Sequence, residues 1–184
     1  FGVKAGIQQN TFNLKLKDGS NWSRQSLLGT GFHVGGIAGI SLNEQFSIQP
    51  QLLFNLKTTA MNSEMKLKMM AIDLPVNFLY KNNGFFAGLG PNFSYGLSAK
   101  SSGDSEQDLY KKYSDEDEAE ASMLKRFELG ANLTMGYQFG NGLIISANYT
   151  QGLSNIAGAE TEHTKYSTRL LGLSVGYMIG GRAK

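Results

Sequence analysis

Apolar and polar residues alternate along most of this chain. A period of two places successive side chains on opposite faces of a β-strand, so each alternating stretch predicts a strand with one apolar and one polar face. Eight such stretches are present, at residues 1–8, 31–42, 46–56, 70–80, 85–97, 127–139, 143–150 and 171–179. Most of them are close to the ~9–11 residues with which a tilted strand crosses a bilayer.

The connections between these stretches alternate between short and long. The short ones carry the Asn and Gly residues that tight hairpin turns prefer, and they are Asn43–Gln45, Lys81–Gly84 and Gly140–Gly142. Long polar loops are expected near 11–29, 57–68, 98–125 and 154–167. In an up-and-down barrel the short turns all lie at one end and the long loops at the other, as in bacterial outer-membrane barrels with periplasmic turns and extracellular loops.

The composition of the polar face indicates which way the strands face. This face holds mainly Gly, Ser, Asn, Gln and Thr, with Lys4, Asp73 and Glu128 as its few mid-strand charges. A soluble barrel needs a more highly charged outer surface, whereas small polar residues suit the narrow lumen of eight strands. The sequence therefore predicts an all-β, eight-stranded antiparallel transmembrane barrel whose lumen holds a polar cluster of Lys4, His33, Gln49, Asp73, Asn77, Glu128 and Asn132.

Aromatic residues on the apolar face gather near both ends of the strands. Such rings are typical of the two membrane–water interfaces. The predicted girdle at the short-turn end contains Phe46, Phe78, Tyr80, Phe85, Tyr137, Phe139 and Tyr177. The predicted girdle at the long-loop end contains Phe32, Phe54, Phe93, Tyr95, Phe127 and Tyr149.

The length and composition of the chain limit the class of protein further. The 184 residues fit one domain, spanning 1–184. No stretch approaches the ~18 consecutive apolar residues of a membrane-spanning helix. The formal net charge of +2 is too small to indicate binding to nucleic acid, and the lack of cysteine excludes disulfides and thiol catalysis.

Because the chain opens directly on a strand-like pattern, we expect a mature form without its signal peptide, located in the bacterial outer membrane.

Several short segments together resemble a known family. They are Gly2–Gly6, Gly31–Gly36, Ser47–Phe54, Ile72–Val76, Gly88–Pro91, Tyr149–Ile156 and Leu171–Tyr177. Their order and spacing are similar to those of the PorT-like outer-membrane β-barrel domain, which is common in the Bacteroidetes lineage. The resemblance implies an eight-stranded outer-membrane barrel and, from some members, a link to protein secretion across that membrane. It implies no catalytic motif.

The candidate chemical sites are weak. His33 lies on the lumen face, and His163 lies in the last long loop beside Glu160 and Glu162, but neither spacing defines a catalytic triad or a zinc site. An acidic run in the third long loop lacks the pattern of a calcium loop and is expected to be a solvated surface segment. Its residues are Asp115, Glu116, Asp117, Glu118 and Glu120. We expect no catalytic, metal or cofactor site.

Cations near the long-loop end suggest a lipid partner. The phosphates of lipopolysaccharide are candidate ligands for Lys111, Lys112, Lys125, Arg126 and Arg169. Snorkelling of rim cations to the membrane surface explains the last two equally well. The expected partners are therefore the lipid bilayer, lipopolysaccharide and an outer-membrane protein bound through the loops. We expect a structural, accessory or surface-interaction role; the alternatives are an outer-membrane lipid-modifying enzyme and a soluble lipocalin-like binder with its apolar face turned inward.

Overall fold

The computed structural model describes residues 1–18, 21–60, 66–102, 107–108, 125–154 and 164–179, and these residues form strands and turns. No helix in this described part of the chain is long and apolar enough to span a membrane. The strands are β1 (Gly2–Asp18), β2 (Asn21–Ile37), β3 (Ile40–Ser41), β4 (Phe46–Ala60), β5 (Lys66–Asn82), β6 (Phe85–Ser102), β7 (Gln107–Asp108), β8 (Phe127–Gln138), β9 (Leu143–Gly152) and β10 (Thr164–Met178).

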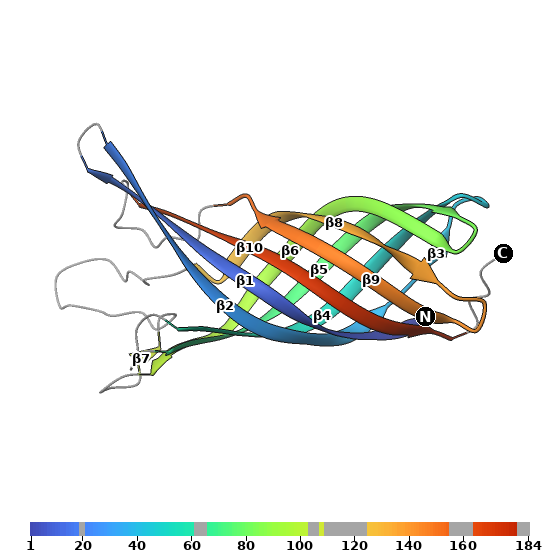
Figure 1. The fold of residues 1–184 in the computed structure, drawn as a ribbon, viewed down its shortest axis with the longest axis horizontal. Coiled ribbons are helices and arrows are strands. Elements are labelled where there is room, and N and C mark those ends of the chain that lie inside the picture. The colour runs from blue at the N-terminus through green and yellow to red at the C-terminus, as the bar shows by residue number, and fades with distance from the viewer. Residues whose placement is uncertain (19–20, 61–65, 103–106, 109–124, 155–163, 180–184) are drawn as a thin grey trace.

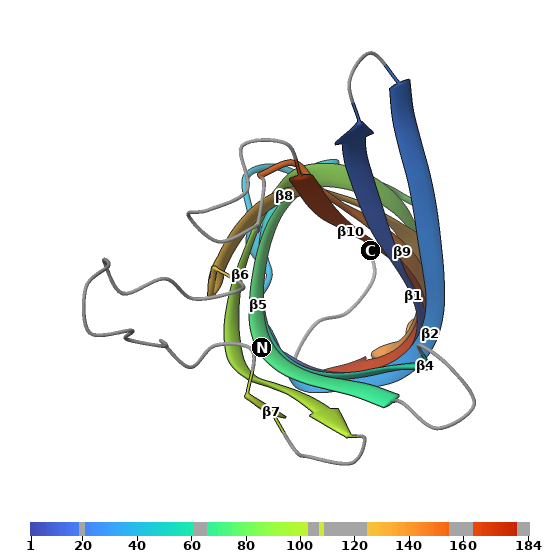
Figure 2. The same cartoon turned by 90° about the vertical axis from the view of Figure 1, so that its left-hand side faces the viewer.

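Eight long antiparallel strands close into a barrel (Figures 1 and 2). The order around the wall is β2-β1-β10-β9-β8-β6-β5-β4, and β4 pairs back onto β2. The first and last strands meet, with Gly2 opposite Met178. Two short segments add to this wall. β3 pairs with β4 beyond the end of β2, and β7 pairs with Lys100 and Ser101 near the C-terminal end of β6. The predicted fold class is confirmed.

The turns at one end are tight, and local chemistry explains them. Asn83 and Gly84 join β5 to β6 with positive φ angles of 50° and 82°, as a two-residue type I′ turn requires. The side-chain oxygen of Asn43 accepts hydrogen bonds from the backbone N–H groups of Gln45 and Phe46, at 2.9 and 2.7 Å. The chain enters β1 and leaves β10 at this same short-turn end (Figure 1).

The two faces of the wall are as different as the alternation predicts. Apolar side chains point outward, and Leu89 is 67% exposed. Polar side chains point into the lumen, and Asn77 is fully buried. A soluble lipid-binding barrel requires the reverse arrangement, so the lipocalin-like alternative is wrong.

The predicted loops at 11–29 and 57–68 are wrong for much of their length. β1 continues to Asp18 and β2 begins at Asn21, and their register pairs extend to Asp18 opposite Asn21. β4 likewise continues to Ala60, and β5 begins at Lys66. These segments are rich in polar residues and were therefore interpreted as loops, although Phe12, Leu14 and Leu16 continue the alternation. Backbone pairing does not require an apolar face.

The strands therefore extend to different lengths at the end opposite the tight turns. β2 pairs with β4 only as far as Gly29 opposite Thr59, and beyond this point the β1–β2 hairpin separates from β4 (Figure 2). β4, β5 and β6 form a second extension, paired up to Lys66 opposite Ser102. β8 and β9, with 12 and 10 residues, are much shorter.

The β5–β6 turn provides a test of the fold. We expect Gly84→Ala to lower the free energy of unfolding by about 1–2 kcal/mol, because a side chain disfavours the left-handed conformation. The new Cβ would also lie 2.7 Å from the Gln138 carbonyl oxygen. The matched control is Gly140→Ala in another short turn, where the new Cβ has no neighbour within 4 Å. Urea unfolding in detergent micelles, followed by circular dichroism, measures both, and equal stability of the two variants would contradict the prediction.

Candidate functional site

The lumen is closed at the short-turn end by an apolar plug. The plug consists of five buried side chains from β2, β5, β6, β9 and β10, namely Ile37, Leu79, Phe86, Ile144 and Met178. Each of these residues occupies a lumen-facing position near a chain end or short turn. Sequence reasoning missed the plug, although a signal was present: Phe78-Leu79-Tyr80 and Tyr177-Met178-Ile179 are apolar triplets that interrupt the alternation.

A chain of side-chain amides lies in the lumen beside the plug. Asn132 Nδ2 donates to Asn77 Oδ1 at 2.8 Å, and the Thr150 hydroxyl donates to Asn132 Oδ1 at 2.8 Å. Lys4 Nζ donates to Gln51 Oε1 at 3.3 Å. Gln51 Nε2 in turn donates to Gln49 Oε1 at 3.0 Å. The structure thus brings four of the predicted lumen residues, Lys4, Gln49, Asn77 and Asn132, into two hydrogen-bonded chains.

His33 joins strands that are far apart in the sequence. Its Nδ1 lies 3.1 Å from Gln8 Oε1, and its Nε2 lies 2.8 Å from Ser174 Oγ. The Ser174 hydroxyl also donates to Asn148 Oδ1 at 3.3 Å. Hydroxyl, imidazole and amide lie in the order of a nucleophile, a base and an orienting group, but the single proton of the Ser174 hydroxyl is directed to Asn148 and not to His33. His33 and Ser174 are both buried inside the lumen.

The buried carboxylates bond to hydroxyl groups of other strands. The Ser94 hydroxyl donates to Asp73. Glu128 accepts from the Thr168 hydroxyl, at 2.8 and 2.9 Å to its two oxygens, and from the Thr168 N–H at 3.3 Å. Of the three charges predicted for the lumen, only Lys4 bonds to a side-chain amide, that of Gln51. Asp73 uses a hydroxyl because Ser94 lies directly opposite it in the β5–β6 register.

Lys57 is a fourth lumen charge that sequence reasoning missed. Its side chain is buried and lines a small cavity together with Asp73 and Glu128. It was missed because residues 57–68 are mostly polar and were interpreted as a loop. Two lysines and two carboxylates therefore occupy the described lumen, and their formal charges sum to zero when His33 is left out of the count.

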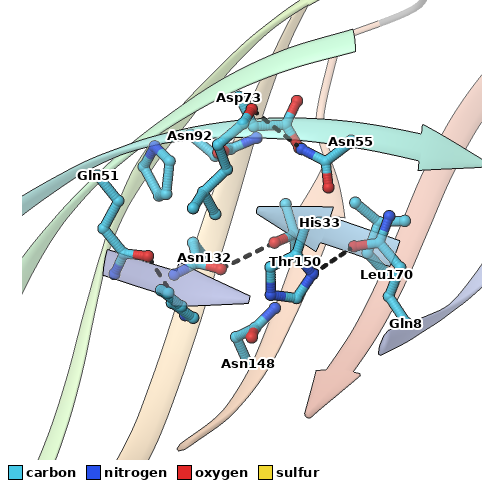
Figure 3. Close-up of a pocket in the computed structure, with 13 residues that line it drawn as sticks. Gln8, His33, Gln51, Asn55, Asp73, Asn92, Asn132, Asn148, Thr150 and Leu170 are labelled. Carbon is cyan, nitrogen blue, oxygen red and sulfur yellow. Dashed lines mark hydrogen bonds between the residues drawn. The ribbon is translucent and has the colours of Figure 1, made fainter. Parts of the chain in front are cut away.

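The space that remains in the lumen is small. A cavity of about 20 Å³ lies among Lys4, His33, Asp73 and Asn132 (Figure 3), and two cavities beside Lys57 are about 20 and 10 Å³. Gln8 Nε2 and Asn77 Nδ2 are buried and have no protein partner. A polar cavity of this size holds about one water molecule, which would satisfy such groups. These cavities cannot admit a substrate the size of a lipid.

The remaining predicted site residues lie outside the lumen or outside the described residues. Phe46 stacks on Phe78 with ring centroids 5.4 Å apart and contacts Tyr80 at 5.5 Å, and Tyr137 contacts Phe139 at 4.9 Å. Phe85 and Tyr177 are also exposed on the outer wall at this end. His163, Lys111, Lys112 and the acidic run Asp115, Glu116, Asp117, Glu118 and Glu120 fall outside the described residues. Within them, no group of three His, Cys, Asp or Glu residues could hold a metal ion.

Comparisons with known proteins agree with this architecture. A family model described as "Outer membrane protein beta-barrel domain" matches residues 1–158. The crystal structure of Neisserial surface protein A is similar, with a TM-score of 0.57, 11% identity, and 95% of this chain and 97% of that chain covered. The outer membrane enzyme PagL gives a TM-score of 0.48, 9% identity and coverages of 92% and 99%. No curated protein matches the sequence significantly.

The amide chain provides a second prediction. We expect Asn132→Ala to lower the free energy of unfolding by about 1–3 kcal/mol, because the buried oxygen of Asn77 and the hydroxyl of Thr150 lose their partner. Ser47→Ala is the matched control, since the Ser47 hydroxyl is buried with no partner and its removal should be neutral or stabilising. Urea denaturation measures both variants, because a shift of the midpoint with an unchanged slope of free energy against urea concentration reports a change in stability. If Asn132→Ala left the free energy of unfolding unchanged, water would be replacing the amide without loss of stability.

Proposed function

Because the chain belongs to the family of outer membrane protein beta-barrel domains, we propose that it is a non-conducting barrel with a structural or surface-interaction role. The observation that carries this proposal is the closed lumen. An apolar plug fills one end, and hydrogen-bonded polar side chains fill the middle. Eight strands leave little free space once side chains occupy the interior, which argues against a diffusion pore.

The projecting strands support the interaction role. β1, β2 and β5 have 17 residues and β6 has 18, whereas ~9–11 residues suffice to cross the bilayer. The additional length lies at the end opposite the tight turns, which is the extracellular end in outer-membrane barrels. Two paired extensions therefore offer a partner a protein surface above the membrane. The PorT-like resemblance suggests a protein-secretion assembly of the outer membrane as the setting, with lipopolysaccharide as the surrounding lipid.

We propose that the barrel is not a lipid-modifying enzyme, and the site geometry supports this. The Ser174–His33–Gln8 arrangement has suitable hydrogen-bond distances. However, catalysis requires the reacting carbonyl to reach the nucleophile, and the adjoining cavity of about 20 Å³ has room for about one water molecule. The arrangement is better explained as a tie between β1, β2 and β10.

Conductance tests the closed lumen. We expect the wild-type protein, inserted into planar phosphatidylcholine bilayers, to show no resolvable current steps. A porin inserted under the same conditions is the positive control. Discrete steps from the wild-type barrel would contradict the non-conducting role, whatever its partners are.

Site-specific crosslinking tests the interaction role. A photoreactive residue at Leu28, which is exposed on β2 next to the β1–β2 extension, should crosslink to a protein in intact cells. The control is the same residue at Leu89, which is equally accessible but lies mid-strand on the apolar band, where only lipid should react. Identical products at both positions would contradict a protein partner at the extension.

A further inference from the structure

All three prolines of the chain lie on adjacent strands of the barrel wall. They are Pro50 on β4, Pro75 on β5 and Pro91 on β6. Proline has no backbone N–H, so within sheets it is normally confined to edge strands, to the first residue of a strand or to bulges. A closed barrel has no edge strand. Pro75 and Pro91 therefore each remove a hydrogen-bond donor from within a ladder.

Both ladders of β5 are broken next to these prolines. The β4–β5 pairs omit β5 residues 74–75, and the β5–β6 pairs omit β5 residues 76–77. The ladders between the other neighbouring long strands run without a break over the described register. β5 also carries the register shift between Met70 and Ala71. β5 is therefore the long strand that is least completely bonded to its neighbours, and we name its residues 74–77 the seam.

The breaks identify the carbonyl groups that lack a donor. Continuing the register across the first break places Pro75 opposite Gln51. Across the second break it places Pro91 opposite Val76. Both prolines stay paired with the strand on their other side, so each missing N–H lay on the broken side. The carbonyls of Gln51 and Val76 therefore lack their ladder donors. In agreement, a Cβ added to Gly90 of β6 would collide with the Val76 carbonyl oxygen.

The seam lies in the middle of the apolar band. Leu74 within it and Leu89 on the adjacent strand are exposed on the outer wall. Pro91 lies between the exposed rings of Phe85 and Tyr95, which are near the two ends of the band on β6. In hydrocarbon no water satisfies an unpaired carbonyl from the lipid side. The wall thus lacks backbone bonds at the depth where an unpaired backbone group is most costly.

A lumen cavity of about 20 Å³ lies directly behind the seam (Figure 3). It is the cavity that contains His33, and its lining includes Gln51, Pro75 and Asn92 from three adjacent strands. Asn77 of the seam is fully buried, and its Nδ2 has no partner among the described residues. The seam therefore separates a small polar space in the lumen from the bilayer.

We propose that the wall opens transiently at the seam and forms a lateral portal through which small uncharged molecules pass between the bilayer and this cavity. Proteins open locally where few interactions hold a segment, and the seam has lost bonds on both sides of β5. A charged molecule would be costly to bring through hydrocarbon. The portal goes beyond the proposed function and is compatible with it, because a lateral path into a cavity does not pass the apolar plug.

Thiol labelling tests the portal, because the chain has no cysteine of its own. Asn92→Cys places a thiol behind the seam. The matched control is Ser146→Cys on β9, which is similarly buried in the lumen behind unbroken ladders. Both variants are treated in phosphatidylcholine nanodiscs with methyl methanethiosulfonate, an uncharged reagent that enters membranes. Each rate is divided by that of the same variant unfolded in urea, which removes differences in thiol reactivity.

The expected difference follows from the missing bonds. A backbone hydrogen bond changes an opening equilibrium by about fivefold, so two missing bonds should make Asn92→Cys react about 25-fold faster than Ser146→Cys. Pro75→Val with Pro91→Val restores both N–H groups and should reduce the rate at Asn92→Cys by about the same factor.

The control for the proline changes is Pro50→Val, because Pro50 remains paired across the β4–β5 ladder. It should change the rate by less than about twofold, since it restores no bond of β5. A band that shifts on boiling in detergent verifies that each variant is folded. If the double variant fails to fold, Pro75→Val and Pro91→Val are each compared with Pro50→Val.

A permanently charged reagent separates the two routes into the lumen. Trimethylammonium-ethyl methanethiosulfonate is excluded from the bilayer core, so it should react with neither cysteine. Rapid labelling of Asn92→Cys by this reagent would place the route at the mouth of the lumen and overturn the proposal. Equal rates for the two cysteines, or a rate that the proline changes leave unaltered, would also overturn it. None of these results bears on conductance or on crosslinking at Leu28, which test the proposed function separately.

Discussion

The structure depends on the closure of its sheet. In hydrocarbon no water is present to satisfy a backbone N–H or carbonyl group, so a spanning sheet can have no free edge. Pairing of β1 with β10 and of β2 with β4 removes both edges. Closure with eight strands then sets a narrow interior, which side chains can fill. The filling of the lumen by side chains therefore follows from the number of strands and is not a separate feature.

The interior is filled in two different ways along its axis. Near the tight turns, Leu79 and Phe86 pack with three other apolar residues, which needs no directional bonding. Farther along, amides, hydroxyls and charges must each find partners, because an unpaired polar group in a low-dielectric interior is costly. His33 illustrates the result, since it connects β2 to both β1 and β10. Such contacts fix the register of strands that closure alone would leave free to slide.

Much of this could be predicted from the sequence, and the failures have physical causes. Alternation located the eight strands and assigned Asn77 inward and Leu89 outward, because one face of each strand had to be apolar. It failed for Lys57, where both faces of the strand are polar, and for Leu79, where both are apolar. Contacts such as His33 with Ser174, which are 141 residues apart, depend on register across the closing strands. A period of two contains no information about which residue of one strand faces which residue of another.

Charged side chains are compensated differently on the two sides of the barrel wall. Inside, Lys4 and Lys57 are matched in number by Asp73 and Glu128, because a buried charge must be compensated within the protein. Outside, Lys68 lies opposite Lys100 in the β5–β6 register, and Lys100 has a further interaction within the protein. A charge on the exposed face can also be hydrated, so it does not depend on a partner inside the wall. The difference between the two faces follows from access to solvent, because water compensates an exposed charge and only the protein can compensate a buried one.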